Sequence, residues 1–165
     1  MRDRAIAALG GVMLLLGCSG DDAPPPPSVT PPAAGWESVS EMLGARCASL
    51  DCHGQPGRPL RLYHRAGLRL ADDDVPGGGA TTAAEHAANL RATAGLEPEV
   101  LARVVREGGL APERLTLVRK AIGREGHKGG APLAAGGPGD ACLRSWLAAA
   151  TDEAACALAA AVERP

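Results

Sequence analysis

Residues 46–54 read RCASLDCHG and place two cysteines, Cys47 and Cys52, in front of His53. A cysteine pair followed at once by a histidine is typical of covalent haem c attachment, in which two thioether bonds hold the porphyrin and the histidine binds the iron. The usual motif has two residues between the cysteines, whereas four separate them here. We expect one covalent haem c, held by these three side chains. A disulfide between the two cysteines is the alternative in an exported protein.

The N-terminal residues predict export. Arg2 and Arg4 precede an apolar run over residues 5–17, which is too short to span a bilayer stably but suits the core of a secretory signal peptide. The run ends in Leu-Leu-Gly before Cys18, which resembles the bacterial lipobox, where cleavage leaves a lipidated cysteine as the new N-terminus. We expect residues 1–17 to be a lipoprotein signal peptide and Cys18 to carry the lipid. A plain signal peptide with an incidental cysteine is the simpler alternative.

The remaining chain divides into a linker and one domain. Residues 18–35 follow the signal, and their second part, residues 23–35, is rich in proline and has no apolar periodicity, which is typical of an extended spacer. Residues 36–165 amount to one domain without repeats. We expect this domain to be lipid-anchored in the bacterial cell envelope, facing the periplasm or the cell exterior.

Composition and charge narrow the class of protein. The chain has no Phe, one Tyr and two Trp against 22 Gly and 14 Pro. Such a chain buries little large apolar surface, so a cofactor or disulfides would help to offset the entropy of ordering it. Removal of residues 1–17 takes away two arginines and one aspartate, which leaves 15 basic against 18 acidic residues, a formal charge of -3. This charge gives no indication of a nucleic-acid partner.

The apolar spacing predicts helices and no strand pair. Trp36, Val39, Leu43 and Cys47 share one helical face, so the first helix runs directly into the attachment stretch. Other helices are expected over residues 82–93, from Pro98 to Gly108, from Pro112 to Gly123, from Asp140 as N-cap to residue 150, and over residues 152–162. The expected fold class is all-α.

The helix that enters the C-x4-C-H segment and the later helix that carries Trp146 resemble the c-type cytochrome fold, in which these two helices cross beside the haem. The resemblance covers residues 36–150, and only the attachment motif and the two helices carry it. It implies a divergent bacterial cytochrome c-like helical domain around one covalent haem, preceded by the signal peptide and the linker.

The distal iron ligand departs from the usual pattern of this family. Small c-type cytochromes commonly use methionine, which raises the reduction potential relative to two histidines. Met1 and Met13 leave with the signal peptide, and Met42 lies five residues before Cys47, badly placed to reach the opposite haem face.

Histidine is therefore the expected distal ligand. His127 lies in a glycine-rich loop over residues 123–132, whose glycines permit close approach to a flat cofactor. Its His-Lys-Gly-Gly segment resembles the His-x-Gly-Gly loops of some divergent bacterial cytochrome c domains. We expect His53 and His127 to bind the iron from opposite sides, and an open or water-bound iron is the alternative. His64 and His86 are not expected to reach it, and His86 is expected to face solvent.

Two further cysteines, Cys142 and Cys156, predict a disulfide in an oxidising compartment. On one continuous helix their Cα atoms would lie about 21 Å apart, too far for a bond. We therefore expect a turn between them at Thr151 and Asp152, with Asp152 as the cap of a short returning helix.

The leading hypothesis is a membrane-tethered monohaem cytochrome that carries electrons to an unidentified redox partner protein, with no catalytic residues of its own. An open-site haem enzyme or gas sensor is a second hypothesis, although only Glu125 near His127 offers acid-base chemistry. A third is a cofactor-free envelope lipoprotein with two disulfides, and a zinc site of the cysteine pair and the two histidines is a minor fourth. Arg58, Arg61 and Arg65 could pair with haem propionates or stay solvated.

Overall fold

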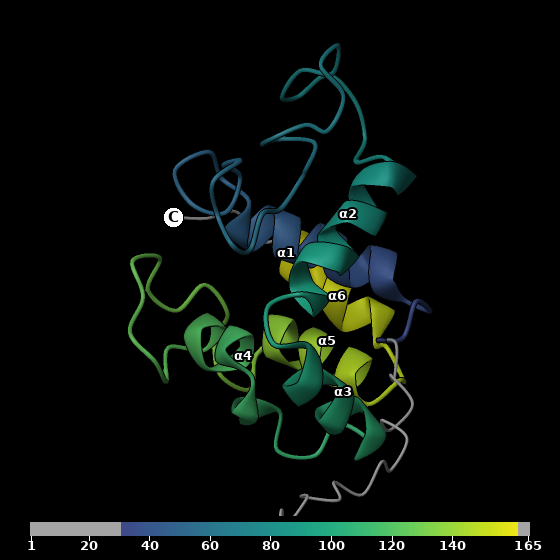
Figure 1. Cartoon of the computed structure of the whole chain (residues 1–165), viewed down its shortest axis with the longest axis vertical. Coiled ribbons are helices and arrows are strands. Elements are labelled where there is room, and N and C mark those ends of the chain that lie inside the picture. The colour runs from purple at the N-terminus through teal and green to yellow at the C-terminus, as the bar shows by residue number, and fades with distance from the viewer. Residues whose placement is uncertain (1–30, 162–165) are drawn as a thin grey trace, which may run out of the picture.

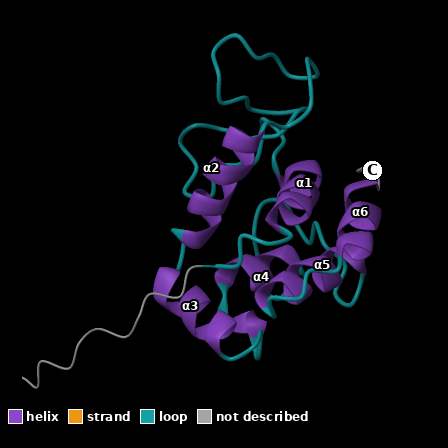
Figure 2. Ribbon diagram, turned by 90° about the vertical axis from the view of Figure 1, so that its right-hand side faces the viewer, coloured by secondary structure: helices purple, strands orange, loops and turns teal. Residues whose placement is uncertain are grey.

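The computed structural model describes residues 31–161. The signal peptide, Cys18 and most of the linker lie outside this range. The described residues form helices and loops without a strand, which confirms the all-α fold class (Figure 2). In chain order the helices are α1 Trp36–Cys47, α2 Ala83–Ala94, α3 Pro98–Arg106, the 3-10 helix η1 Pro112–Arg114, α4 Thr116–Ala121, α5 Pro138–Leu147 and α6 Glu153–Ala161 (Figure 1). No helix among them is long and apolar enough to cross a membrane.

Helices α1, α5 and α6 pack together as the centre of the domain. Their shared core is built around Trp36 of α1 and Trp146 of α5, whose ring centroids lie 4.9 Å apart. Each indole N–H donates to a backbone carbonyl, that of Trp36 to His86 and that of Trp146 to Pro32. The apolar face expected for the first helix is buried in this core, and it includes Cys47 at the end of α1.

The sequence predicts one helix from Pro112 to Gly123, but the structure has two shorter helices, η1 and α4, so this prediction was wrong. Leu115 is extended, with φ -78° and ψ 128°, so η1 ends before α4 begins. The carboxylate of Glu97 accepts hydrogen bonds from the backbone N–H of Thr116 at 2.7 Å and from its hydroxyl at 3.0 Å. The Glu97 side chain thus accepts hydrogen bonds at the N-terminus of α4 and stabilises the start of a new helix there.

The N-cap expected at Asp140 was also wrong. Helix α5 starts two residues earlier at Pro138, which suits a first-turn position, and Asp140 lies in its first turn. Its carboxylate accepts from the backbone N–H of Gly136 at 2.9 Å and from Arg144 at 2.6 Å, one turn ahead. Asp140 therefore closes the loop before the helix instead of capping it.

The disulfide between Cys142 and Cys156 is present, with Cα atoms 4.8 Å apart. It joins α5 to α6 across the expected turn, where Asp152 accepts a hydrogen bond from the backbone N–H of Ala155 at 2.9 Å. Both the pairing and the Asp152 cap are confirmed.

Candidate functional site

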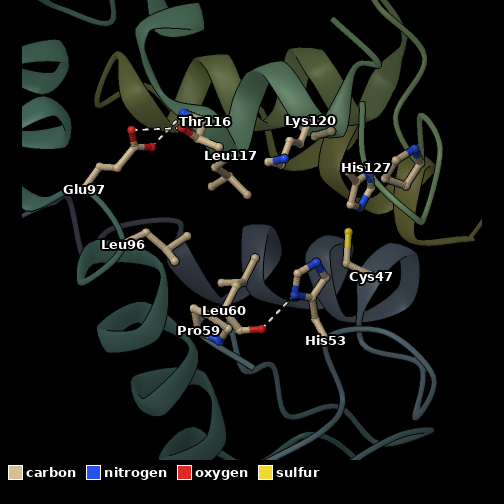
Figure 3. Close-up of a pocket in the computed structure, with 12 residues that line it drawn as sticks. Cys47, His53, Pro59, Leu60, Leu96, Glu97, Thr116, Leu117, Lys120 and His127 are labelled. Atoms are coloured by element: carbon tan, nitrogen blue, oxygen red, sulfur yellow. Dashed lines mark hydrogen bonds between the residues drawn. The ribbon is translucent and has the colours of Figure 1, made fainter. Parts of the chain in front are cut away.

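An apolar hollow of about 330 Å³ lies where α1 ends, between α4 and the loop that carries His53 (Figure 3). Its walls come from four parts of the chain: the end of α1, the loop after it, the α2–α3 connection and the segment from α4 to the glycine-rich loop. The lining residues are Cys47, His53, Pro59, Leu60, Leu96, Glu97, Thr116, Leu117, Lys120, Ala121, His127 and Pro132. A hollow of this size and apolar character suits a small-molecule ligand.

His53 is held by three hydrogen bonds, two through its own backbone and one through its ring. The loop after α1 folds back so that the His53 N–H donates to the Cys47 carbonyl at 3.1 Å, and Leu62 N–H donates to the His53 carbonyl at 2.8 Å. The His53 Nδ1–H donates to the Leu60 carbonyl at 2.8 Å, because a carbonyl can only accept. This bond leaves Nε2 without the proton, and Figure 3 shows that nitrogen turned toward the His127 side of the hollow.

The electrostatic setting of His53 favours the neutral imidazole. Burial lowers its pKa below 6.5, as do the charges of His127 and Arg58, while the hydrogen bond to Leu60 acts in the opposite direction. A neutral ring with an unprotonated Nε2 and a carbonyl on Nδ1 is the form in which histidine binds metals.

His127 is held in the same way by its own loop. Its Nδ1–H donates to the Gly130 carbonyl at 2.8 Å, so that Nε2 is the nitrogen left for a metal. The imidazole lies so close to Gly129 that a Cβ there would come within 2.9 Å of Nε2. Glycine at this position therefore makes room for the ring.

The two imidazoles are in a stacked arrangement, with ring centroids 6.3 Å apart and planes inclined by 22°. Because a metal–imidazole nitrogen bond is about 2 Å long, a metal ion bound from opposite sides by two imidazoles separates their centroids by roughly 6 Å. The observed spacing fits one metal ion between His53 and His127.

A second hollow of about 330 Å³ adjoins the first at this histidine pair. It shares Cys47, His53, His127 and Pro132 with the first, and adds Cys52 and Gly129 to the wall. The cysteine pair and the histidine pair thus meet around one space. Neither cysteine takes part in a disulfide within residues 31–161.

The described residues contain no group of three or more His, Cys, Asp or Glu side chains that could hold a metal ion by themselves. Zinc sites use three or four protein ligands, so the zinc alternative gains no support. A haem iron needs only the two axial ligands from the protein, since the porphyrin provides the others. The donor set of two histidines beside two cysteines fits haem c.

His64 and His86 lie elsewhere, in a polar cluster between α1 and α2. The expectation that His86 faces solvent was wrong: it is 8% exposed, and its Nδ1 lies 2.9 Å from the Ser40 hydroxyl. His64 is buried as well, and both rings approach the Glu41 carboxylate through Nε2, at 3.4 Å and 3.5 Å. Met42 is fully buried in the helical core.

Most of the apolar wall was missed by the sequence reasoning, including Leu96, Glu97 and Lys120. Leu96 and Glu97 precede α3, and Lys120 lies on α4; no local motif links these segments to the attachment stretch. Arg58 and Arg61, considered as partners for haem propionates, line a different hollow, and Arg65 lines neither of the two beside the histidines.

Comparison with models of protein families, with curated protein sequences and with solved structures gave no match. Conclusions about the site therefore rest on its own geometry.

Proposed function

We propose that the protein is a monohaem c-type cytochrome that carries electrons in the bacterial cell envelope. One observation carries the proposal: two imidazoles lie 6.3 Å apart, each anchored through Nδ1 to a carbonyl, beside the C-x4-C-H cysteines. Haem iron supplies a reversible one-electron change when bound at such a site.

The chain's own residues would do the holding and orienting. Cys47 and Cys52 would form the thioethers, His53 would be the proximal ligand and His127 the distal ligand. The Leu60 and Gly130 carbonyls fix which nitrogen each ring offers. The apolar wall would cover one side of the haem, and such burial is one of the factors that set the reduction potential of the iron.

Two histidine ligands leave no position for a substrate, so transfer of electrons fits the site better than catalysis. Glu125, the one acid-base candidate near His127, is occupied by ion pairs with Arg119 and Lys120 at 2.8 and 2.9 Å. This engagement gives the open-site enzyme no support.

The test is co-expression with a haem c maturation system, followed by denaturation. We expect haem to stay on the polypeptide and the intact mass to rise by one haem. Cys47→Ala with Cys52→Ala should abolish this attachment. The matched control, Cys142→Ala with Cys156→Ala, removes the disulfide and should leave attachment in place. A wild-type chain that retains no haem after denaturation and carries two disulfides would favour the cofactor-free lipoprotein.

Lipid anchoring through Cys18 belongs to the same proposal, because a tethered carrier can meet a partner at the membrane surface. Cys18→Ser should block acylation and leave an uncleaved or misplaced precursor, seen as a larger intact mass without the lipid. A variant that still matures to the same acylated product and partitions with membranes as before would point to another anchor.

A further inference from the structure

A third hollow, of about 410 Å³, lies beside the histidine site and is lined by three arginines. Arg58 and Arg61 come from the loop that follows His53, and Arg91 comes from the last turn of α2. Tyr63, Leu70 and Pro59 form much of the remaining wall. We call this feature the cationic hollow.

The guanidinium groups of the loop arginines are positioned by backbone carbonyls. Arg58 donates from Nε to the Cys52 carbonyl at 3.0 Å, and Arg61 donates from Nη1 to the Pro56 carbonyl at 3.3 Å. Arg61 also lies over the Tyr63 ring, 5.5 Å from its centroid. Carbonyls and an aromatic face orient these groups without neutralising their charge.

Within residues 31–161 no Asp or Glu lines the cationic hollow, and no ion pair involves Arg58, Arg61 or Arg91. Other arginines of the domain contact a carboxylate: Arg69, Arg114, Arg119, Arg124 and Arg144. A domain with more acidic than basic residues thus keeps three cations uncompensated at one place.

The wall also has the features of a protein contact. Arginine and tyrosine are enriched in the central parts of protein interfaces. Leu70 is 42% exposed at the edge of the hollow and offers an apolar contact beside the charges. Pro59 lines both this hollow and the apolar hollow of the histidine site, so a bound partner would lie next to the cofactor.

We propose that the cationic hollow docks an acidic segment of a partner protein, with carboxylates on the three arginines and an apolar side chain on Leu70. That this partner exchanges electrons with the chain rests on the proposed function. The docking itself needs only protein atoms that are present in the described structure.

The probe is a fluorescein-labelled pentapeptide, EELEE, with KKLKK as its charge-reversed counterpart. Binding is measured by fluorescence anisotropy on the full chain, with and without haem, at about 0.02 M and 0.2 M salt. We expect EELEE to bind, KKLKK not to bind, and higher salt to weaken the complex. Arg58→Gln, Arg61→Gln and Arg91→Gln combined should weaken binding by about tenfold.

The charge-matched control is Arg65→Gln, Arg103→Gln and Arg106→Gln combined, three exposed arginines away from the hollow. It should retain most of the affinity. Equal loss in both triple variants would overturn the proposal, because the attraction would then be unspecific. Inorganic phosphate that binds while EELEE does not would also overturn it, in favour of a small-anion site.

Measurements on the chain with and without haem test the docking independently of the proposed function. In a haem-loaded chain, fluorescein on EELEE should be quenched on binding because the hollow adjoins the histidine site. Site-specific binding to a chain that never attaches haem would support the docking and refute the cytochrome. Haem attachment without any binding of EELEE would refute the docking alone.

Discussion

The domain contains two pairs of histidines that differ in what lies next to Nε2 of the ring. His53 and His127 are half-buried, and each uses Nδ1 on a carbonyl and presents Nε2 to a hollow. His64 and His86 are buried, and their rings share the Glu41 carboxylate. The difference shows that the second ring nitrogen, not the presence of a histidine, decides whether a histidine can bind a metal.

The residues around the two histidine pairs differ as well. The polar cluster between α1 and α2 is closed by reciprocal hydrogen bonds, since Asn89 binds both Ser40 and the backbone of Tyr63. The histidine site has an apolar wall and a glycine-rich loop. Removal of a side chain should therefore change stability in the first region and ligand binding in the second.

The largest expected effect is on iron coordination. His127→Ala should convert a six-coordinate low-spin iron into an open or water-bound one, while the thioethers retain the haem. Visible and electron paramagnetic resonance spectra report this change, and carbon monoxide binding should appear. His64→Ala and His86→Ala are the matched controls and should leave the spectra unchanged. A parent protein that already binds carbon monoxide, with His127→Ala silent, would favour the open-site alternative.

The next effect is on folding. Glu85 is fully buried and binds Arg69, with two further hydrogen bonds from the backbone N–H groups of Leu70 and Thr82. Burial alone would raise its pKa, but these bonds lower it to about 2, so the carboxylate is charged. Glu85→Ala should lower the free energy of unfolding by about 3 kcal/mol, because Arg69 loses its buried carboxylate partner and keeps only the half-exposed Asp74, at 3.4 Å.

Urea unfolding measures this loss. The control is Glu99→Ala on the exposed side of α3, which should change the free energy by less than about 0.5 kcal/mol. A loss in Glu85→Ala no larger than that of the control would contradict the ion-pair account.

A smaller effect is expected at the His127 loop. Gly129→Ala would bring a Cβ within 2.9 Å of the imidazole and displace it. Changes in the support of a ligand commonly weaken metal binding by about tenfold or more, so we expect a roughly tenfold larger five-coordinate fraction. Gly126→Ala is the control, since nothing lies within 4 Å of its Cβ position. Similar spectra for both variants would show that the loop tolerates the added methyl group.

The smallest effect concerns acid stability. The hydrogen bond from His64 lowers the pKa of Glu41 from 4.5 to about 2, against the effect of burial and with help from Thr81. The carboxylate therefore stabilises the fold above pH 4.5, and this contribution is lost as the pH falls toward 2. Because Glu41 is 37% exposed, we expect less than about 1 kcal/mol. Glu41→Gln should flatten the stability profile over this pH range, and an unchanged slope would refute the assignment.

Local pattern predicted most of the helices. The apolar face from Trp36 to Cys47, the first-turn Pro98 and the Asp152 cap act within a few residues of the chain, and each appears where the sequence predicts it. The disulfide could also be predicted, because Cys142 and Cys156 are two further cysteines in a protein expected in an oxidising compartment. Helix geometry then predicts the turn between them.

The sequence by itself specified the C-x4-C-H stretch and the helical class through local spacing, and it left Cys142 and Cys156 as the cysteines expected to form a disulfide. Tertiary structure alone decided which histidines keep Nε2 available and where α4 begins. The carbonyls on His53 and His127 lie only 7 and 3 residues away, but the state of the buried histidines and the start of α4 depend on partners far along the chain: Ser40 is 46 residues from His86, and Glu97 is 19 residues from Thr116. Hydrogen bonds over such separations form only when the helices pack, so no local pattern records them.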